Sequence, residues 1–165
     1  MRLRKYKKDD ANEIVKWIKT EREKALWSAD RYKNFPILPE DINEEYEKTS
    51  KICNIYPMTL TDGNKVVGHI ILRNPTEDKS VFRFGYVIVS SNIRGKGYGK
   101  TLLLEAIRFA KEKLSAKKIT LGVFAENEAA LKCYESVGFK VVEIGKETFK
   151  FEDEKWSFVE MEYGF

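Results

Sequence analysis

The segment Ser90-Ser-Asn-Ile-Arg-Gly-Lys-Gly-Tyr-Gly99 lies between a predicted strand and a predicted helix. Its three glycines let the backbone approach a ligand closely and turn N–H groups toward it. The following helix contributes the positive end of its dipole, and three basic side chains stand near the same point. The pattern favours binding of a polyphosphate or pyrophosphate, although a tight turn with solvated lysines would use the same residues. The candidate ligand-binding residues are Arg94, Gly95, Lys96, Gly97, Tyr98, Gly99 and Lys100.

Two nucleotide-binding motifs fail by one residue each in this segment. A P-loop, G-x-x-x-x-G-K-[ST], ends correctly at Gly99-Lys100-Thr101 but needs glycine where the chain has Arg94. A dinucleotide motif, G-x-G-x-x-G, starting at Gly95 needs glycine where the chain has Lys100. An ATP-dependent enzyme therefore remains only an alternative interpretation.

Outward from this segment, the hydrophobic pattern predicts an α+β fold, with a mixed, mostly antiparallel central sheet flanked by helices. We expect one domain over residues 1–165, without repeats or linkers. A capping-box-like start at Asp10 and Glu13 predicts the first helix, and Asp62-Gly63 predicts a hairpin turn. The predicted strands are 2–6, 58–61, 65–72, 81–89, 118–125 and a hairpin within 139–165, and the other predicted helices are 20–32, 40–51, 99–114 and 127–137.

The composition excludes several classes of protein. The 165 residues are 42% hydrophobic and 34% charged, with a net charge of +4, which is typical of a globular protein and argues weakly against nucleic-acid binding. No apolar stretch is long enough for a membrane span, and the basic N-terminus lacks the apolar region of a signal peptide. Cys53, Cys133 and the single His69 form no disulfide framework or zinc motif. We expect a cytoplasmic protein without a metal.

Two blocks of sequence resemble the GNAT N-acetyltransferases. Arg94-x-x-Gly97-x-Gly99 matches the [Q/R]-x-x-G-x-[G/A] signature of that family. The second block, Asn127-Glu-Ala-Ala130 through Tyr134-Glu-Ser-Val-Gly138-Phe139, looks like the family's N-x-x-A-x-x-x-Y-x-x-x-G-F helix. The resemblance is specific over about residues 81–140. It implies the acyl-CoA N-acyltransferase fold, with the glycine loop holding the pyrophosphate of acetyl-CoA.

The same resemblance assigns roles around the end of the strand Val87-Ile88-Val89. This strand end is expected to separate from strand 118–125, so that acetyl-pantetheine enters the gap and bonds to the backbone there. The N–H of Val89 then polarises the thioester carbonyl, and Tyr134 protonates the departing sulfur. Asn127 is expected to cap its helix and to contact pantetheine. From the residues themselves, a core aromatic side chain is the better explanation of Tyr134, and it is the family resemblance that favours the catalytic role.

One position departs from the family pattern. Many GNAT enzymes carry a glutamate general base where this chain has Arg83, which cannot accept a proton at neutral pH. The base is then a water chain, a carboxylate such as Glu143 or Glu147, or absent, and His69 is a weaker candidate that more naturally packs in the sheet. We expect direct transfer without an acyl-enzyme. A non-catalytic CoA-binding sensor is the alternative that Arg83 suggests.

The acceptor is the least defined partner. The resemblance places its pocket between the early helices and the last hairpin, where acidic and aromatic residues cluster. This cluster could bind a cationic primary amine or simply form a solvated helix face. Phe84-Gly-Tyr-Val-Ile88 favours the branch that contains ribosomal-protein N-terminal and spermidine acetyltransferases. A homodimer is a further candidate assembly. The residues of the cluster are Trp27, Tyr32, Phe35, Glu40, Asp41, Glu44, Glu45, Tyr46 and Glu47.

Overall fold

The computed structural model describes residues 1–165, and all its strands belong to one sheet with the order β1-β2-β3-β4-β5-β7-β6. Every pair of neighbours is antiparallel except β4 and β5, which run parallel. This confirms the mixed, mostly antiparallel α+β fold. The strands are β1 Arg2–Lys5, β2 Asn54–Asp62, β3 Lys65–Asn74, β4 Val81–Val89, β5 Lys118–Phe124, β6 Lys140–Phe151 and β7 Glu154–Gly164.

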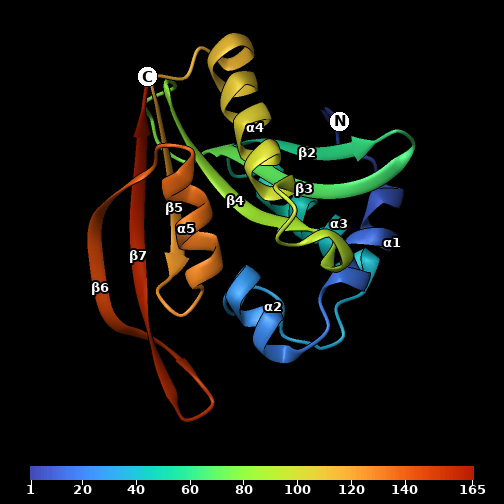
Figure 1. Ribbon diagram of the computed structural model, residues 1–165, viewed down its shortest axis with the longest axis vertical. Coiled ribbons are helices and arrows are strands. Elements are labelled where there is room, and N and C mark those ends of the chain that lie inside the picture. The colour runs from blue at the N-terminus through green and yellow to red at the C-terminus, as the bar shows by residue number, and fades with distance from the viewer.

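Helices cover both faces of the sheet. Figure 1 shows α4 and α5 in front of it, with α3 behind and α2 below the divergence of β4 and β5. The front helices bury their apolar side chains against one face in the main core, which contains Leu102, Ala106 and Leu121. A second core, with Ile14, Ile42 and Ile71, joins α1 and α3 to the opposite face. The helices are α1 Ala11–Ile14, α2 Glu21–Ser28, α3 Pro39–Ser50, α4 Tyr98–Leu114 and α5 Glu128–Ser136.

The predicted hairpins and helices are present, but the helix predicted over residues 20–32 ends at Ser28, where Ala29 has a φ of +53°, and the first helix needs a further correction. Asp62 and Gly63 form the turn between β2 and β3, with Gly63 at a φ of +56°. Asp10 does not cap α1 with its side chain, and α1 is one short turn between two 3-10 turns. The carboxylate of Asp10 instead accepts hydrogen bonds from Arg4 and Thr59, so it ties β1 and β2 to the helical segment.

The pairing of β4 with β5 ends early. The register joins Val81 to Lys118, Phe82 to Ile119 and Arg83 to Thr120, and no later pair exists. Figure 1 shows the two strands starting side by side and diverging as they descend, with α5 in front of the opening. The divergence expected from the family resemblance is therefore present. No helix in the structure is long and apolar enough to cross a membrane.

Candidate active site

The end of β4 presents unpaired backbone to the gap beside β5. The N–H of Ser90 donates to the carbonyl of Val67 on β3 at 2.9 Å. Successive N–H groups along a strand point to opposite sides, so the N–H of Val89 points away from β3 and into the gap. A bulge in the β3–β4 pairing, with Tyr86 at a φ of +49°, turns this last part of the strand. The gap thus contains a backbone donor with no partner strand.

The glycine loop adjoins this gap and leads into α4. Gly95 and Gly97 have φ values of +77° and +84°, a conformation that side chains other than glycine adopt rarely. A Cβ atom added at either position would meet no atom within 4 Å, so the space above the loop backbone is open. Gly97 is the residue before α4, and it has no side chain that could accept a hydrogen bond from the helix. The first N–H groups of this 17-residue helix are therefore free. This end of α4 is suited to an anion.

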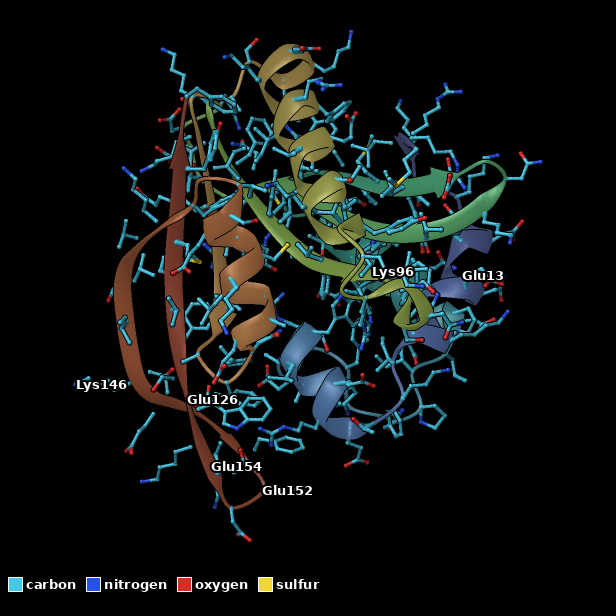
Figure 2. All side chains as sticks on the ribbon, viewed as in Figure 1. Glu13, Lys96, Glu126, Lys146, Glu152 and Glu154 are labelled. Atoms are coloured by element: carbon cyan, nitrogen blue, oxygen red, sulfur yellow. The ribbon has the colours of Figure 1, made fainter.

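Two side chains of the loop are held by other elements. Arg94 donates to the carboxylate of Glu23 on α2 at 2.8 Å and to the carbonyl of Trp17 at 3.0 Å. The hydroxyl of Tyr98 donates to Asp62 in the β2–β3 turn at 2.9 Å. These two residues therefore position the loop, whereas Lys96 and Lys100 stay exposed. Figure 2 shows Lys96 on the loop after β4 and Glu126 after β5, well apart across the diverging strands.

The second motif forms α5, which packs beside the start of α4. Asn127 accepts a hydrogen bond from the N–H of Ala130 at 3.3 Å, so its predicted capping role is confirmed. Gly99 lies against α5 so closely that a Cβ there would be 3.3 Å from the sulfur of Cys133. Burial raises the pKa of the Cys133 thiol, which opposes a nucleophilic role.

Tyr134 lies on the buried side of α5. It is 7% exposed and belongs to the main core, against which Val87 and Val89 also pack. Its ring meets Phe139 edge-to-face, with the centroids 6.1 Å apart. Burial, with a smaller contribution from Cys133, raises the pKa of Tyr134 well above its ordinary value. The hydroxyl therefore stays protonated, as a proton donor must.

Arg83 forms an ion pair that sequence reasoning did not find. Its guanidinium donates to Glu160 on β7 and to Thr120 on β5 at 3.1 Å, crossing the sheet where β4 and β5 part. It passes over Gly122, where a Cβ would clash with Phe158 and lie 2.8 Å from Arg83. Glu160 lies 77 residues from Arg83, so only the glycine on β5 could have suggested the crossing. Arg83, at the position where the resemblance expects a glutamate base, is thus held in an ion pair with Glu160.

The other candidate bases occupy different surroundings. His69 is fully buried, shares a hydrogen bond with the hydroxyl of Tyr46, and burial lowers its pKa to about 3. Glu147 is exposed and pairs with Lys155 at 3.8 Å. Glu143 lines a cavity of about 470 Å³, together with Glu160 and three phenylalanines of β5, β6 and β7. Of these candidates, Glu143 is the one that borders a cavity next to Arg83.

The acidic stretch on α3 separates into different roles. Asp41 accepts from the N–H of Leu38 and caps the helix, and Glu47 pairs with Lys8 at 3.7 Å. Glu45 turns inward and accepts a hydrogen bond from Tyr86 at 3.4 Å. No group of three or more His, Cys, Asp or Glu side chains that could hold a metal ion occurs in the structure.

A family model and several known proteins match the chain. The model of the acetyltransferase (GNAT) family matches residues 14–139. The chain belongs to this family. N-acetylaspartate synthetase from Xenopus tropicalis is 38% identical over 102 residues, which cover 62% of this chain and 36% of that protein. This GNAT chain spans about half or less of the length of the first curated relatives it matches.

Two solved structures share the fold of this GNAT chain. The spermidine N-acetyltransferase from Vibrio cholerae, in complex with CoA and spermine, superposes with a TM-score of 0.80 at 21% identity, over 99% of this chain and 94% of its own. The ribosomal-protein-alanine N-acetyltransferase from Brucella melitensis superposes with a TM-score of 0.77 at 21% identity, over 100% of both chains. At this identity the likeness establishes the fold.

Proposed function

We propose that this protein is an acetyl-CoA-dependent N-acetyltransferase that moves the acetyl group directly from CoA to a primary amine, within one domain formed by residues 1–165. The observation that carries the proposal is the gap between β4 and β5, with the N–H of Val89 directed into it and the start of α4 beside it. In this proposal Val87, Ile88 and Val89 contact the acetyl-pantetheine, and the loop from Arg94 to Lys100 receives the pyrophosphate. Asn127 contacts the pantetheine from the start of α5.

The reaction forms a bond between the amine nitrogen and the acetyl carbon, and breaks the bond between that carbon and the CoA sulfur. The N–H of Val89 stabilises the oxygen of the tetrahedral intermediate, where charge develops. The ammonium form of the substrate first loses one proton to water or to a carboxylate, and the neutral amine then attacks. Tyr134 gives its proton to the departing sulfur and is restored by the second proton lost from the nitrogen, directly or through water. The products are an N-acetylated amine, CoA as the thiol, and the one proton released from the ammonium form.

The acceptor class is broad at this stage. The polyamine in the complex with the Vibrio enzyme and the protein acceptor in the name of the Brucella enzyme make a small polyamine-like molecule and a protein N-terminus the first candidates. We also propose a cytoplasmic location, in keeping with two free cysteines.

Thermal unfolding with acetyl-CoA, CoA and Mg·ATP in parallel tests the co-substrate. A ligand at 100 times its Kd stabilises by about 2.7 kcal/mol, which raises Tm by about 5–10 °C for a domain of this size. We expect this rise with acetyl-CoA and CoA and none with Mg·ATP. A rise with Mg·ATP alone would favour the ATP-dependent alternative instead.

A pair of glycine variants tests whether the loop binds the ligand. Gly97→Ala places a methyl group where the pyrophosphate approaches, and Gly63→Ala in the β2–β3 turn is the matched control. Both glycines have positive φ, at +84° and +56°, and at neither would a Cβ meet an atom within 4 Å. Both variants should therefore lose similar stability, about 1–2 kcal/mol. Only Gly97→Ala should weaken acetyl-CoA binding. Equal affinity in the two variants would make the loop a simple turn.

The alternative of a non-catalytic CoA-binding sensor has one supporting observation, the Arg83–Glu160 ion pair at the usual position of the base. Release of CoA thiol on addition of any amine from a broad panel would exclude a sensor. CoA binding without thiol release would favour it.

A further inference from the structure

Three arginines gather on the α3 face of the sheet, beside the point where β4 and β5 part. Arg73 on β3 and Arg83 on β4 are direct cross-strand partners. Arg31, after α2, is close enough to both Arg73 and Tyr86 to influence their ionisation. Like charges directly opposite each other on a sheet are destabilising, so this arrangement requires compensation.

Only one of the three has a carboxylate partner. Glu160 pairs with Arg83, whereas neither Arg31 nor Arg73 has a carboxylate oxygen within 4.0 Å. The Nε atom of Arg73 is enclosed without a hydrogen-bond partner. Burial, together with Arg31 and Arg83, lowers the pKa of Arg73. A guanidinium only donates hydrogen bonds. What this position lacks is therefore a negatively charged group that accepts them.

The surrounding aromatic side chains also carry hydrogen-bond donors that have no acceptor. Trp27 stacks on Tyr32 with centroids 5.7 Å apart, and both rings contact Tyr86. The Nε1 of Trp27 and the hydroxyl of Tyr32 are buried without partners. Glu45 is the acidic group that faces Tyr86, through a long hydrogen bond of 3.4 Å. The region is therefore rich in donors and contains one carboxylate without a close cationic partner.

Arg73 and Arg83 lie on β3 and β4 at the point where β4 leaves β5. Arg83 marks the last paired position of β4 and β5, and Val87 follows it by four residues, or about 13 Å along an extended strand. Helices α4 and α5 pack on the opposite face, and in the proposal below the amine substrate enters from the face that carries Arg73. Arg73 lies five residues along β3 from Gly68, the partner of Val89, so its long side chain has to cover part of that separation.

We propose that the acceptor is an amino acid, a small amine that also carries a carboxylate, and that Arg73 and Arg31 bind this carboxylate. The proposal rests on the N-acetyltransferase function proposed above and defines its substrate class. Glu45, which accepts a hydrogen bond from Tyr86, is then the acidic group available to the ammonium group. A polyamine, with positive charge at both ends, would meet Arg31 and Arg73 with like charge.

Matched acceptor pairs test the proposal directly. The purified protein with acetyl-CoA is given each standard L-amino acid and its α-amide, together with lysine against cadaverine and with spermidine, and acetylated product is measured by mass. We expect at least one amino acid to be acetylated with a kcat/KM at least about 10-fold above that of its partner lacking the carboxylate. One charge-assisted hydrogen bond is worth about 1.5–3 kcal/mol, or about 10- to 150-fold.

Variants separate binding of the carboxylate from a structural role of the arginine. Arg73→Met keeps the apolar part of the side chain and removes the charge. If this variant is unstable, Arg31→Gln, at an exposed residue, is used for the same measurement. Either should raise KM for the amino acid about 10-fold or more, leave KM for its amide nearly unchanged and leave acetyl-CoA affinity unchanged. Arg108→Met on α4, where the arginine pairs with Glu105, is the matched control and should change none of these values.

The two proposals fail in different ways. Acetylation of spermidine or cadaverine but of no amino acid would overturn the carboxylate site and leave the acetyltransferase function intact. An equal rise in KM for acid and amide in the Arg73 and Arg31 variants would also overturn the carboxylate site. Absence of both acetyl-CoA binding and product with every acceptor would overturn the function itself.

Discussion

Tyr134 shows how one buried side chain can serve both packing and chemistry. It lies in the main core against Phe139 and next to the strand end that carries Val89. Because burial raises the pKa of Tyr134, the hydroxyl remains protonated through the neutral range and is available as a hydrogen-bond donor to the departing sulfur, where negative charge develops.

Replacement of this hydroxyl tests its role. Tyr134→Phe should lower kcat by about 10²–10⁴-fold, the usual contribution of a general acid, with acetyl-CoA affinity nearly unchanged because the ring is retained. Tyr163→Phe is the control, since Tyr163 also packs on Phe139, with centroids 5.5 Å apart, but lies on β7. Steady-state rates and thermal shifts with acetyl-CoA measure both effects. Equal kcat values in the two variants would show that Tyr134 only packs in the core and would contradict its role as a proton donor.

At the scale of elements, Asp10 holds the first strand to the helical segment. Its carboxylate accepts from Arg4 at 2.7 and 2.8 Å, from the N–H of Lys7 at 2.8 Å and from Thr59 at 2.8 Å. Burial alone would raise the pKa of Asp10, but these hydrogen bonds outweigh it and lower the pKa. The stabilisation is thus complete above the unfolded pKa of about 3.9 and is lost as pH falls through the folded value.

The variant Asp10→Asn should therefore be less stable at pH 7 by about 1–3 kcal/mol, the cost of leaving the partners of a buried group unpaired. The difference from the natural protein should shrink as pH falls below about 4, because protonation removes the same charge. Urea unfolding at several pH values measures this, and Asp9→Asn at the exposed neighbour is the control. A difference that stays constant from pH 7 to pH 3 would contradict the assignment.

At the scale of the whole molecule, the sheet ends at a strand whose outer edge has no partner and which exposes apolar side chains. β6 lies at the edge, and Val141, Val142 and Ile144 are 43%, 53% and 56% exposed. An exposed edge of this kind invites pairing with a second copy. We expect a dimer in sedimentation at micromolar concentration, and a monomer for Val142→Lys with Ile144→Lys. Leu104→Lys, at a residue 44% exposed on α4, is the control. A monomeric natural protein would contradict the expectation.

The elements themselves were largely predictable because their signals are local. Asp62-Gly63 specifies a turn, and the apolar spacing of α4 specifies a helix, since each depends on residues close in the chain. The same local reasoning failed at Asp10, where the pattern of a helix cap was present but Arg4 and Thr59 compete for the carboxylate. The hydrogen bonds from Arg4 and Thr59 are favoured because water can accept the hydrogen bond of the helix N–H group in place of Asp10.

The sequence by itself determined the glycine loop, the helix that starts at Asn127 and their order, and with them the family and the proposed co-substrate. Only the tertiary structure decided where Arg83 finds Glu160, and that Arg31 and Arg73 stand together without a carboxylate. The physical reason is range. Backbone motifs act through neighbouring residues, whereas the acceptor side is built from side chains on α2, α3, β3, β4 and β7 that meet only when the sheet forms and β4 parts from β5.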